Sequence, residues 1–120
     1  MPKEKPIIEV CNVKHSFAKG GGEAVVLNRV NLSLFDGEIV ALLGTSGSGK
    51  STLLRLIAGL LQPTSGEVQY HGETIDRPIP GLSMVFQHFA LLPWQTVFQN
   101  VEMALESQKI DEDERRLRAL

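Results

Sequence analysis

Apolar and polar residues alternate along the first part of the chain, which predicts paired β-strands. Residues 7–13 suggest a first strand, and residues 24–35 carry apolar side chains of one parity and suggest a second. Consecutive glycines within residues 19–23 predict a hairpin loop between the two strands. A tight turn at Asp36-Gly37 then leads into the apolar, β-prone segment 38–43, so the chain is expected to open with an antiparallel arrangement.

The spacing of apolar residues becomes helical after residue 49. It predicts a helix that runs to Leu60 or Leu61 and is stopped by Pro63. Short strands are expected at 67–70 and 82–86, with a turn and a loop between them.

The C-terminal part of the sequence predicts two more helices. Thr96 and Gln99 form a capping-box pattern before a helical apolar face. Asp111 with Glu114 resembles a second helix start, and the arginines that follow match the helix dipole.

The composition is that of one folded domain or less. The 120 residues are 42% hydrophobic and 22% charged, which predicts a packed core. The net charge is −2 and no long basic run occurs, so nucleic acid is not favoured as a partner. Cys11 is the only cysteine, which excludes a disulfide framework and fits a reducing cytoplasm. No apolar stretch approaches the roughly 18 residues that span a bilayer, so a membrane role is expected to come through a partner.

Residues 44–52 carry the most specific chemistry in the chain. They read Gly-Thr-Ser-Gly-Ser-Gly-Lys-Ser-Thr and fit the phosphate-loop pattern G-x-x-x-x-G-K-[ST]. In this pattern glycines let backbone N–H groups surround phosphate oxygens, Lys50 reaches the β and γ phosphates, and Ser51 places its hydroxyl on Mg²⁺. The β-prone segment before the loop and the helix after it disfavour an incidental Gly/Ser turn.

Longer motifs around this loop resemble the N-terminal half of an ABC transporter ATPase subunit. The resemblance runs from about Ile7 to the end of the chain. It is carried by L-x-x-V-N-L-x-L-x-x-G-E at 27–38, SGSGKSTLLRLIAGL at 46–60, PTSGE at 63–67, and MVFQ at 84–87, which resembles the Q-loop. The sequence of residues 91–101 is similar to the corresponding sequence in ATPase subunits of importers for nitrate, sulfonate and taurine-type anions.

This resemblance implies an α/β phosphate-loop NTPase fold. It implies an antiparallel β subdomain, part of the core sheet and the start of the helical subdomain. The expected domains are a nucleotide-binding core at 1–87, with A-loop, Walker A and Q-loop, and a truncated start of the helical subdomain at 88–120.

The resemblance also assigns ATP and Mg²⁺ as cofactors. Phe17 is expected to stack on adenine, the alternative being an ordinary core phenylalanine, and His15 lies nearby. Ser51 and Gln87 are the expected metal contacts, and Lys50 and Gln87 contribute to catalysis without completing a catalytic site. The full set of expected nucleotide contacts is Phe17, Gly44, Ser46, Gly47, Ser48, Gly49, Lys50, Ser51, Thr52 and Gln87.

The implied partners are transmembrane permease subunits, a second ATPase subunit and, indirectly, a solute-binding protein. The implied location is peripheral, at the cytoplasmic face of the inner (plasma) membrane. Leu91, Leu92 and Trp94 are either a local apolar core or part of the surface that meets a membrane subunit. His71 and His88 show no metal-ligand spacing.

The sequence departs from the family pattern downstream. It contains no Leu-Ser-Gly-Gly-Gln signature, no Walker B segment with its catalytic acid and no switch histidine. We therefore expect the chain to be the front part of a longer protein, with an open sheet edge and no ATP turnover of its own.

Three functions stay open. In the first, the complete subunit is an ATPase that powers the import of a small solute, and the resemblance favours an anion. Alternatively, the chain is a non-hydrolysing module that binds ATP or docks to a membrane subunit. A small-molecule kinase is disfavoured, because a long antiparallel pattern precedes Gly44. The transported solute is not encoded in these residues.

Overall fold

The computed structural model describes residues 4–87, 91–106 and 112–119 of the chain. The residues fall into two compact units, Met1–Met84 and Val85–Leu120. The expected domain boundary after residue 87 is close to this division but stays a prediction.

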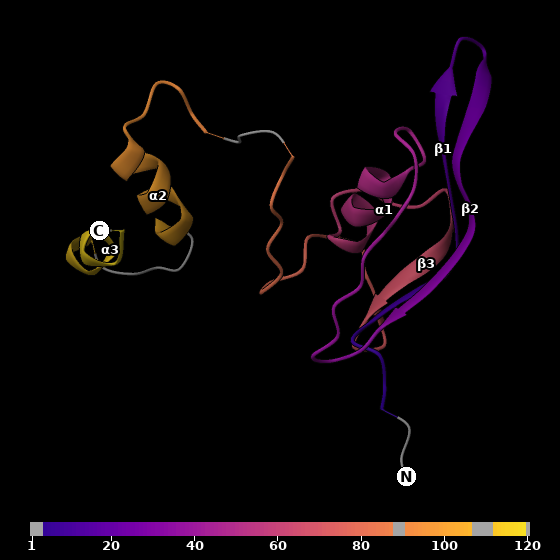
Figure 1. Ribbon diagram of the computed structural model, residues 1–120, viewed down its shortest axis with the longest axis horizontal. Coiled ribbons are helices and arrows are strands. Elements are labelled where there is room, and N and C mark those ends of the chain that lie inside the picture. Colours follow the sequence, from indigo (N-terminus) through magenta and orange to yellow (C-terminus); the bar gives the residue numbers. More distant parts are fainter. Residues whose placement is uncertain (1–3, 88–90, 107–111, 120) are drawn as a thin grey trace. The chain divides into compact units, whose positions relative to one another are not determined.

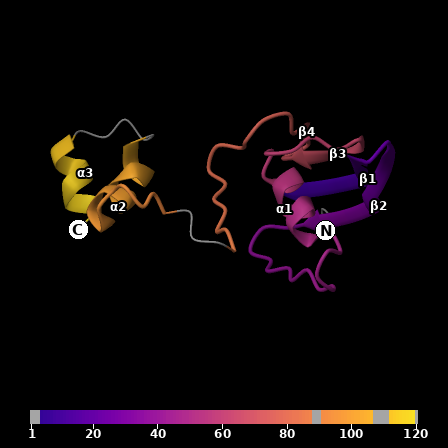
Figure 2. The same ribbon diagram turned by 90° about the horizontal axis from the view of Figure 1, so that it is seen from above.

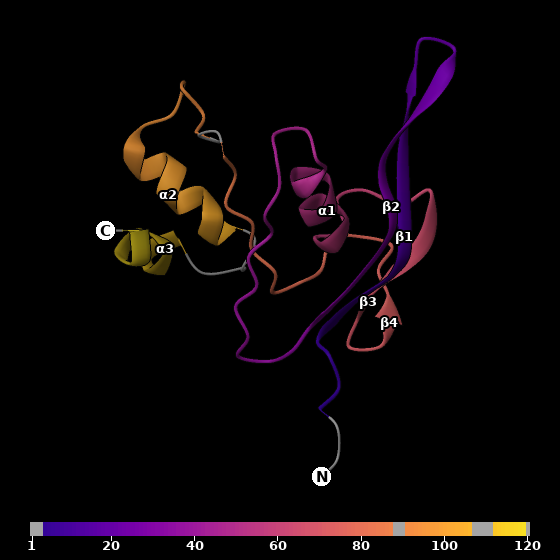
Figure 3. The same cartoon turned by 45° about the vertical axis from the view of Figure 1, so that its right-hand side comes forward.

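The first unit is built on an antiparallel sheet. Its strands are β1 (Ile8–Lys19), β2 (Gly22–Leu34), β3 (Ser65–Tyr70) and β4 (Glu73–Thr74), in the order β2-β1-β3-β4 (Figure 2). The predicted hairpin is confirmed, and its two strands extend well beyond β3 (Figures 1 and 3). β1 is longer than the sequence indicated because it pairs with β2 along its whole length.

The sheet carries β-bulges around the middle of β1. Between the pairs Val10–Leu32 and Val13–Val30, β1 has one residue more than β2. The imbalance is then reversed, because β2 has one extra residue before the pair His15–Leu27 and another directly after it. Each bulge changes which residues share a face, so simple alternation does not describe this part of the sheet.

Helix α1 (Lys50–Ile57) lies beside the sheet (Figures 1 and 3) and closes the core of this unit. Leu53 and Leu56 are three residues apart, so they lie on the same side of the helix, and both are buried. They join buried side chains from the sheet and from the segment after β4. The buried apolar cluster comprises Ile8, Val10, Val13, Leu27, Leu53, Leu56, Val68 and Ile75.

The helix ends earlier than the position of Pro63 predicted. The N–H of Gly59 donates to the carbonyl of Leu56 (3.2 Å), and the N–H of Leu60 donates to that of Arg55 (2.9 Å). This pair of bonds is the Schellman motif, which requires a left-handed residue, and Gly59 supplies it with φ 77°. The glycine therefore stops the helix at Ile57, before the proline is reached.

The strands predicted at 38–43 and 82–86 do not form. Neither segment pairs with another strand among the described residues. Ile39 is 98% exposed, Leu43 93% and Val85 97%. A β-prone segment becomes a strand only when its backbone groups meet a neighbouring strand, so composition alone was misleading here.

The second unit contains α2 (Val97–Glu106) and α3 (Glu112–Ala119). The capping box is confirmed: the N–H of Thr96 donates to Oε1 of Gln99 (2.9 Å), and the N–H of Gln99 donates to Oγ1 of Thr96 (3.1 Å). The predicted second helix is present and is strengthened by an ion pair between Arg118 and Glu114. Asp111, its expected first residue, lies outside the described residues.

The three helices are short relative to a bilayer. In the described ranges, none combines the length and the apolar character that crossing a membrane requires.

Candidate functional site

The phosphate loop closes around the side chain of Lys50. The Lys50 ammonium donates to the carbonyl oxygens of Gly44 (2.6 Å) and Thr45 (2.8 Å) and to Oγ of Ser48 (3.2 Å). The loop thus turns oxygen atoms toward a cation at its centre. A lysine amine has three donors on a flexible stem, so it can exchange these oxygens for those of a phosphate without a change in the backbone.

The start of α1 supplies further hydrogen-bond donors beside the loop. The first helical hydrogen bond runs from the N–H of Leu53 to the carbonyl of Gly49 (2.9 Å). The N–H groups of Lys50, Ser51 and Thr52 precede that bond and have no acceptor within the helix. Together with the helix dipole, they form a set of donors suited to an anion.

Gly49 fixes the loop against the sheet. It has φ 97°, and a Cβ there would lie 2.8 Å from Cδ2 of Leu27 and 3.0 Å from Cγ1 of Val26. Only glycine meets both demands, the left-handed backbone and the close approach to β2. The contact holds the start of α1 at the middle of β2.

Phe17 lies close to that contact along the sheet. His15 pairs with Leu27, the residue that touches Gly49, and Phe17 follows two residues later on β1. The rings of His15 and Phe17 meet edge to face with centroids 4.7 Å apart. His15 is buried, whereas Phe17 is 43% exposed. Phe17 is therefore not an ordinary core side chain, and its role in stacking on adenine stays a prediction.

Thr64 also supports this region, although its sequence pattern does not indicate that role. Its Oγ1 accepts a hydrogen bond from the N–H of Ser16 (3.0 Å), and its own N–H donates to the carbonyl of Lys14 (2.9 Å). These bonds tie the segment after α1 to the strand that carries Phe17. The only signal was the PTSGE motif, which gave no structural role.

Most of the remaining predicted contacts are exposed to solvent. Gly44, Ser46, Gly47, Ser48 and Ser51 are exposed on the loop and helix start, and Thr52 is half-buried. Gln87 is exposed and belongs to the second unit, so its contact with the phosphates and the metal stays a prediction.

The metal role of Ser51 also stays a prediction. Across the described ranges, no group of three His, Cys, Asp or Glu side chains is arranged to hold a metal ion. His71 is exposed, and His88 lies outside the described residues.

The segment before α2 does not bury Leu91, Leu92 and Trp94 together in a local core. Trp94 is 77% exposed and Leu91 65%, while Leu92 is half-buried. Asn100 fixes this segment, since its Oδ1 accepts from the N–H of Leu92 (2.9 Å) and its Nδ2 donates to the carbonyl of Thr96 (2.9 Å). The indole is thus presented to solvent on a hydrogen-bonded turn, which leaves the local-core alternative unsupported for Trp94.

Comparison with known proteins agrees with this geometry. The family model for ABC transporters matches residues 27–120. The chain is 45% identical to the nitrate import ATP-binding protein NrtD of Synechocystis over 108 residues, which are 90% of this chain and 41% of that protein. It is 43% identical over 105 residues to the bicarbonate transport ATP-binding protein CmpD of Synechococcus elongatus, covering 88% of this chain and 38% of CmpD.

A solved structure shares the fold. The ATP-binding cassette MJ0796, in a dimeric post-hydrolysis state bound to ADP and Pi, superposes with a TM-score of 0.80 and 34% sequence identity. The match covers 93% of this chain and 53% of that one. The chain therefore spans about two fifths of the length of its curated relatives and half of the solved cassette.

Proposed function

Because this chain belongs to the ABC transporter family of ATP-binding proteins, we propose that it binds ATP through residues 44–52 and forms part of a subunit that powers solute import. The single observation that carries the proposal is the arrangement of Lys50. Its ammonium lies among loop oxygens, directly before a helix start with free N–H donors.

The fit of the site to a triphosphate rests on three features. The loop concentrates N–H donors at a helix N-terminus, Lys50 adds a mobile positive charge, and Gly49 holds both against β2. A Cβ at Gly44 would lie 2.6 Å from Oγ of Ser48, so a larger residue there would displace the hydroxyl that accepts from Lys50. The Ser51 hydroxyl is the group that would hold Mg²⁺, and Mg²⁺ when bound neutralises charge on the phosphates.

Phe17 is proposed to receive the adenine. A half-exposed aromatic ring backed by a buried one is a rigid platform for a base. Phe17 lies on β1 two residues beyond His15, which pairs with the Leu27 that approaches Gly49, and this position supports simultaneous contacts with base and phosphates. Gln87 is proposed to contact the metal site and sense the γ phosphate.

The complete protein is proposed to import a small inorganic anion. The names of the relatives NrtD and CmpD, which refer to nitrate and bicarbonate, support that class. Import implies permease subunits in the membrane, a solute-binding protein and a peripheral position on the cytoplasmic side. The exposed Trp94 and Leu91 support docking to such a permease. A second ATPase subunit is supported by the dimeric state named for MJ0796.

Calorimetric titration of Mg-ATP into the purified chain tests the proposal. We expect saturable binding that is lost on Lys50→Ala, because the substitution removes the cation at the centre of the loop. Lys19→Ala, on the exposed hairpin, is the matched control and is expected to bind as the parent does. Equal affinity for all three proteins would count against the loop assignment.

Phosphate release distinguishes the enzyme from its alternative, a module that binds ATP or docks to a permease without turnover. We expect no steady release from the 120-residue chain, since it lacks the carboxylates that orient water and metal. Steady release that disappears in Lys50→Ala would overturn that expectation. The exposure of Trp94 favours docking as the second candidate function.

A further inference from the structure

The bulges in β1 and β2 bring polar residues together at a second place in the first unit. Between the pairs Val13–Val30 and His15–Leu27, Lys14 on β1 stands opposite two residues of β2, Asn28 and Arg29. The neighbouring bulge adds Asn12 on β1. β-Bulges re-aim side chains, and here both do so at adjacent positions.

Two of these residues have an unusual backbone. Asn12 has φ 46° and Arg29 has φ 50°, both in the left-handed region. That region costs of order 1 kcal/mol for a residue with a side chain, and more for Arg than for Asn, so it persists only where its surroundings enforce it.

One side chain holds both strained positions. Asn31 Oδ1 accepts from the N–H of Asn12 (3.0 Å), and Asn31 Nδ2 donates to Oδ1 of Asn12 (3.1 Å) and to the carbonyl of Arg29 (3.2 Å). On the other side, Gly66 packs so closely that a Cβ would lie 2.3 Å from the carbonyl oxygen of Asn12. The strained geometry is therefore built in from both flanking strands.

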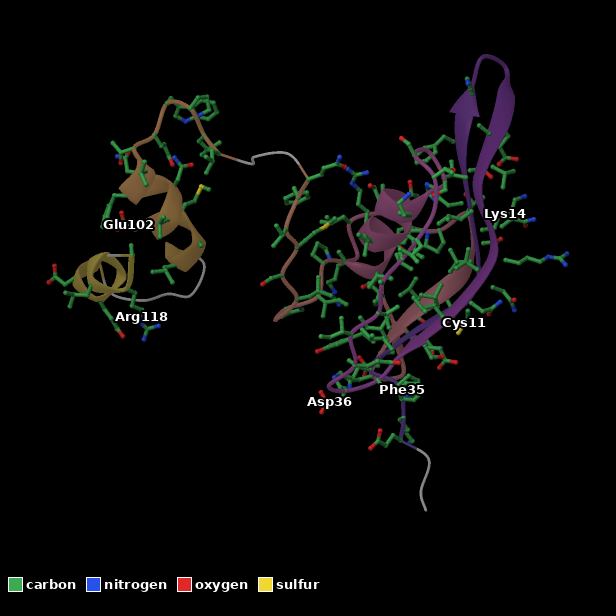
Figure 4. The ribbon with its side chains drawn as sticks, in the orientation of Figure 1. Cys11, Lys14, Phe35, Asp36, Glu102 and Arg118 are labelled. Atoms are coloured by element: carbon green, nitrogen blue, oxygen red, sulfur yellow. The ribbon has the colours of Figure 1, made fainter. Side chains whose placement is uncertain are left out.

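The result is a hollow of about 640 Å³, here named the bulge pocket. It is lined by Asn12, Lys14, Asn28, Arg29, Ser65 and Gly66. Its volume lies within the range of small-molecule sites. Lys14 extends away from α1 (Figure 4), between the buried Val13 and His15, so the bulge pocket and the α1 side of β1 are distinct.

The charge of the bulge pocket points to an anion. Its lining contains two cationic side chains and no acidic one. Neither cation has a carboxylate within ion-pair distance in the part of the chain that is described. The nearby carboxylate of Glu67 accepts hydrogen bonds from Gln69 (3.0 Å) and Thr74 (2.6 Å) instead. The chain as a whole is acidic, so this concentration of positive charge is local.

We propose that the bulge pocket binds a small phosphate-bearing anion. The guanidinium of Arg29 is suited to two parallel hydrogen bonds with phosphate oxygens, and Lys14 adds a point charge. The amides of Asn12 and Asn28 and the hydroxyl of Ser65 are neutral donors around the same hollow. This proposal does not depend on ATP binding at the phosphate loop.

The test is a nuclear magnetic resonance titration of the isotope-labelled chain at constant ionic strength. Its arms use inorganic phosphate, glycerol 3-phosphate and phosphatidylglycerol vesicles, which separate a free phosphate from a lipid headgroup. We expect saturable shifts of the amides of 12–14, 28–29 and 65–66 in at least one arm, with an affinity on the order of 1 mM. Amides of 46–52 report separately on the phosphate loop.

Variants decide whether the shifts come from the pocket. Lys14→Gln and Arg29→Gln are each expected to weaken the pocket response about tenfold and leave the loop response unchanged, whereas Lys14→Arg retains it. Lys19→Gln removes one charge from the same strand outside the pocket and is expected to change neither response. Pocket shifts in no arm, or shifts that Lys19→Gln weakens as much as Lys14→Gln, overturn the proposal.

Discussion

The ammonium of Lys50 and the carbonyl oxygen of Gly44, at opposite ends of the phosphate loop, are joined by a 2.6 Å hydrogen bond. Thr45 and Ser48 complete the oxygen shell around that nitrogen. These three oxygens surround a space that fits a compact ammonium group, so positive charge is not the only property required of the side chain at position 50.

Lys50→Arg is therefore expected to lower ATP affinity at least about tenfold although it keeps the charge, because a planar guanidinium does not fit among three converging oxygens. Calorimetric titration provides the measurement. Arg55→Lys, an exposed exchange on the last turn of α1, is the control and is expected to leave affinity unchanged. A Lys50→Arg chain that binds ATP as the parent does would show that positive charge is the only requirement.

Substitution of two loop glycines distinguishes the cost of backbone strain from the cost of steric overlap. Gly47 and Gly49 both have left-handed φ, 81° and 97°, but only Gly49 has neighbours that a Cβ would meet. Gly47→Ala is expected to cost about 1 kcal/mol of unfolding free energy, and Gly49→Ala about 2 kcal/mol or more, since Leu27 and Val26 must move. Urea unfolding measures both. Equal losses would mean that β2 adjusts without cost to the added methyl group.

The hydroxyl of Thr64 is expected to stabilise the strand that carries Phe17. Thr64→Val keeps the shape but leaves the N–H of Ser16 without its 3.0 Å acceptor, and the loss of this exposed hydrogen bond is expected to cost about 1 kcal/mol. Thr74→Val removes the hydroxyl with which Thr74, on β4, donates to the carboxylate of Glu67, and this bond between two side chains is expected to contribute less. Urea unfolding compares the two variants, and a larger loss for Thr74→Val would contradict the assignment.

Cys11 offers a test by chemical reactivity. Burial raises the pKa of its thiol above the ordinary value, and the carboxylates of Glu9 and Glu67 raise this pKa further. The folded chain therefore holds less thiolate near neutral pH than the unfolded chain does. Alkylation by iodoacetamide is expected to be slower in the folded state and to catch up as pH rises through the folded-state pKa.

The same shift has a consequence for stability. Because the folded-state pKa is the higher one, the contribution of Cys11 to stability is complete below the unfolded-state pKa and is lost as pH rises through the folded-state pKa. Glu67→Gln is expected to speed alkylation of the folded chain at neutral pH. Identical rates in parent and variant would remove Glu67 as a cause of the shift.

The sequence predicted those elements whose determinants are local. Alternation gave the β1–β2 hairpin, the capping box of Thr96 and Gln99 gave α2, and the glycine-lysine pattern gave the loop before α1. It misplaced the end of α1, because Pro63 predicts a later stop than Gly59, which ends the helix first through backbone bonds that composition does not record. It assigned strands to 38–43 and 82–86, where pairing depends on a partner strand.

The sequence indicates which residues form the candidate site, but it does not indicate the contacts that hold them in place. Lys50, Ser51 and the loop glycines follow from their spacing. The contacts that hold the site in place join residues distant in sequence or displaced by bulges. They are the contact of Gly49 with Leu27, the ring contact of His15 with Phe17 and the hydrogen bond from Ser16 to Thr64. The bulge pocket depends on register shifts in β1 and β2, which no periodic pattern predicts.

The bulges of β1 also decide where the chain tolerates changes in length. Removing one residue between Cys11 and Ser16 would exchange the two faces for the rest of the strand and turn Phe17 to the opposite side. At the hairpin tip, Gly20 and Gly21 have nothing within 4 Å of an added Cβ. Insertions acquired there leave the placement of the aromatic ring intact, so divergence in loop length among descendants of this sequence is expected at the tip and not in the bulged part of β1.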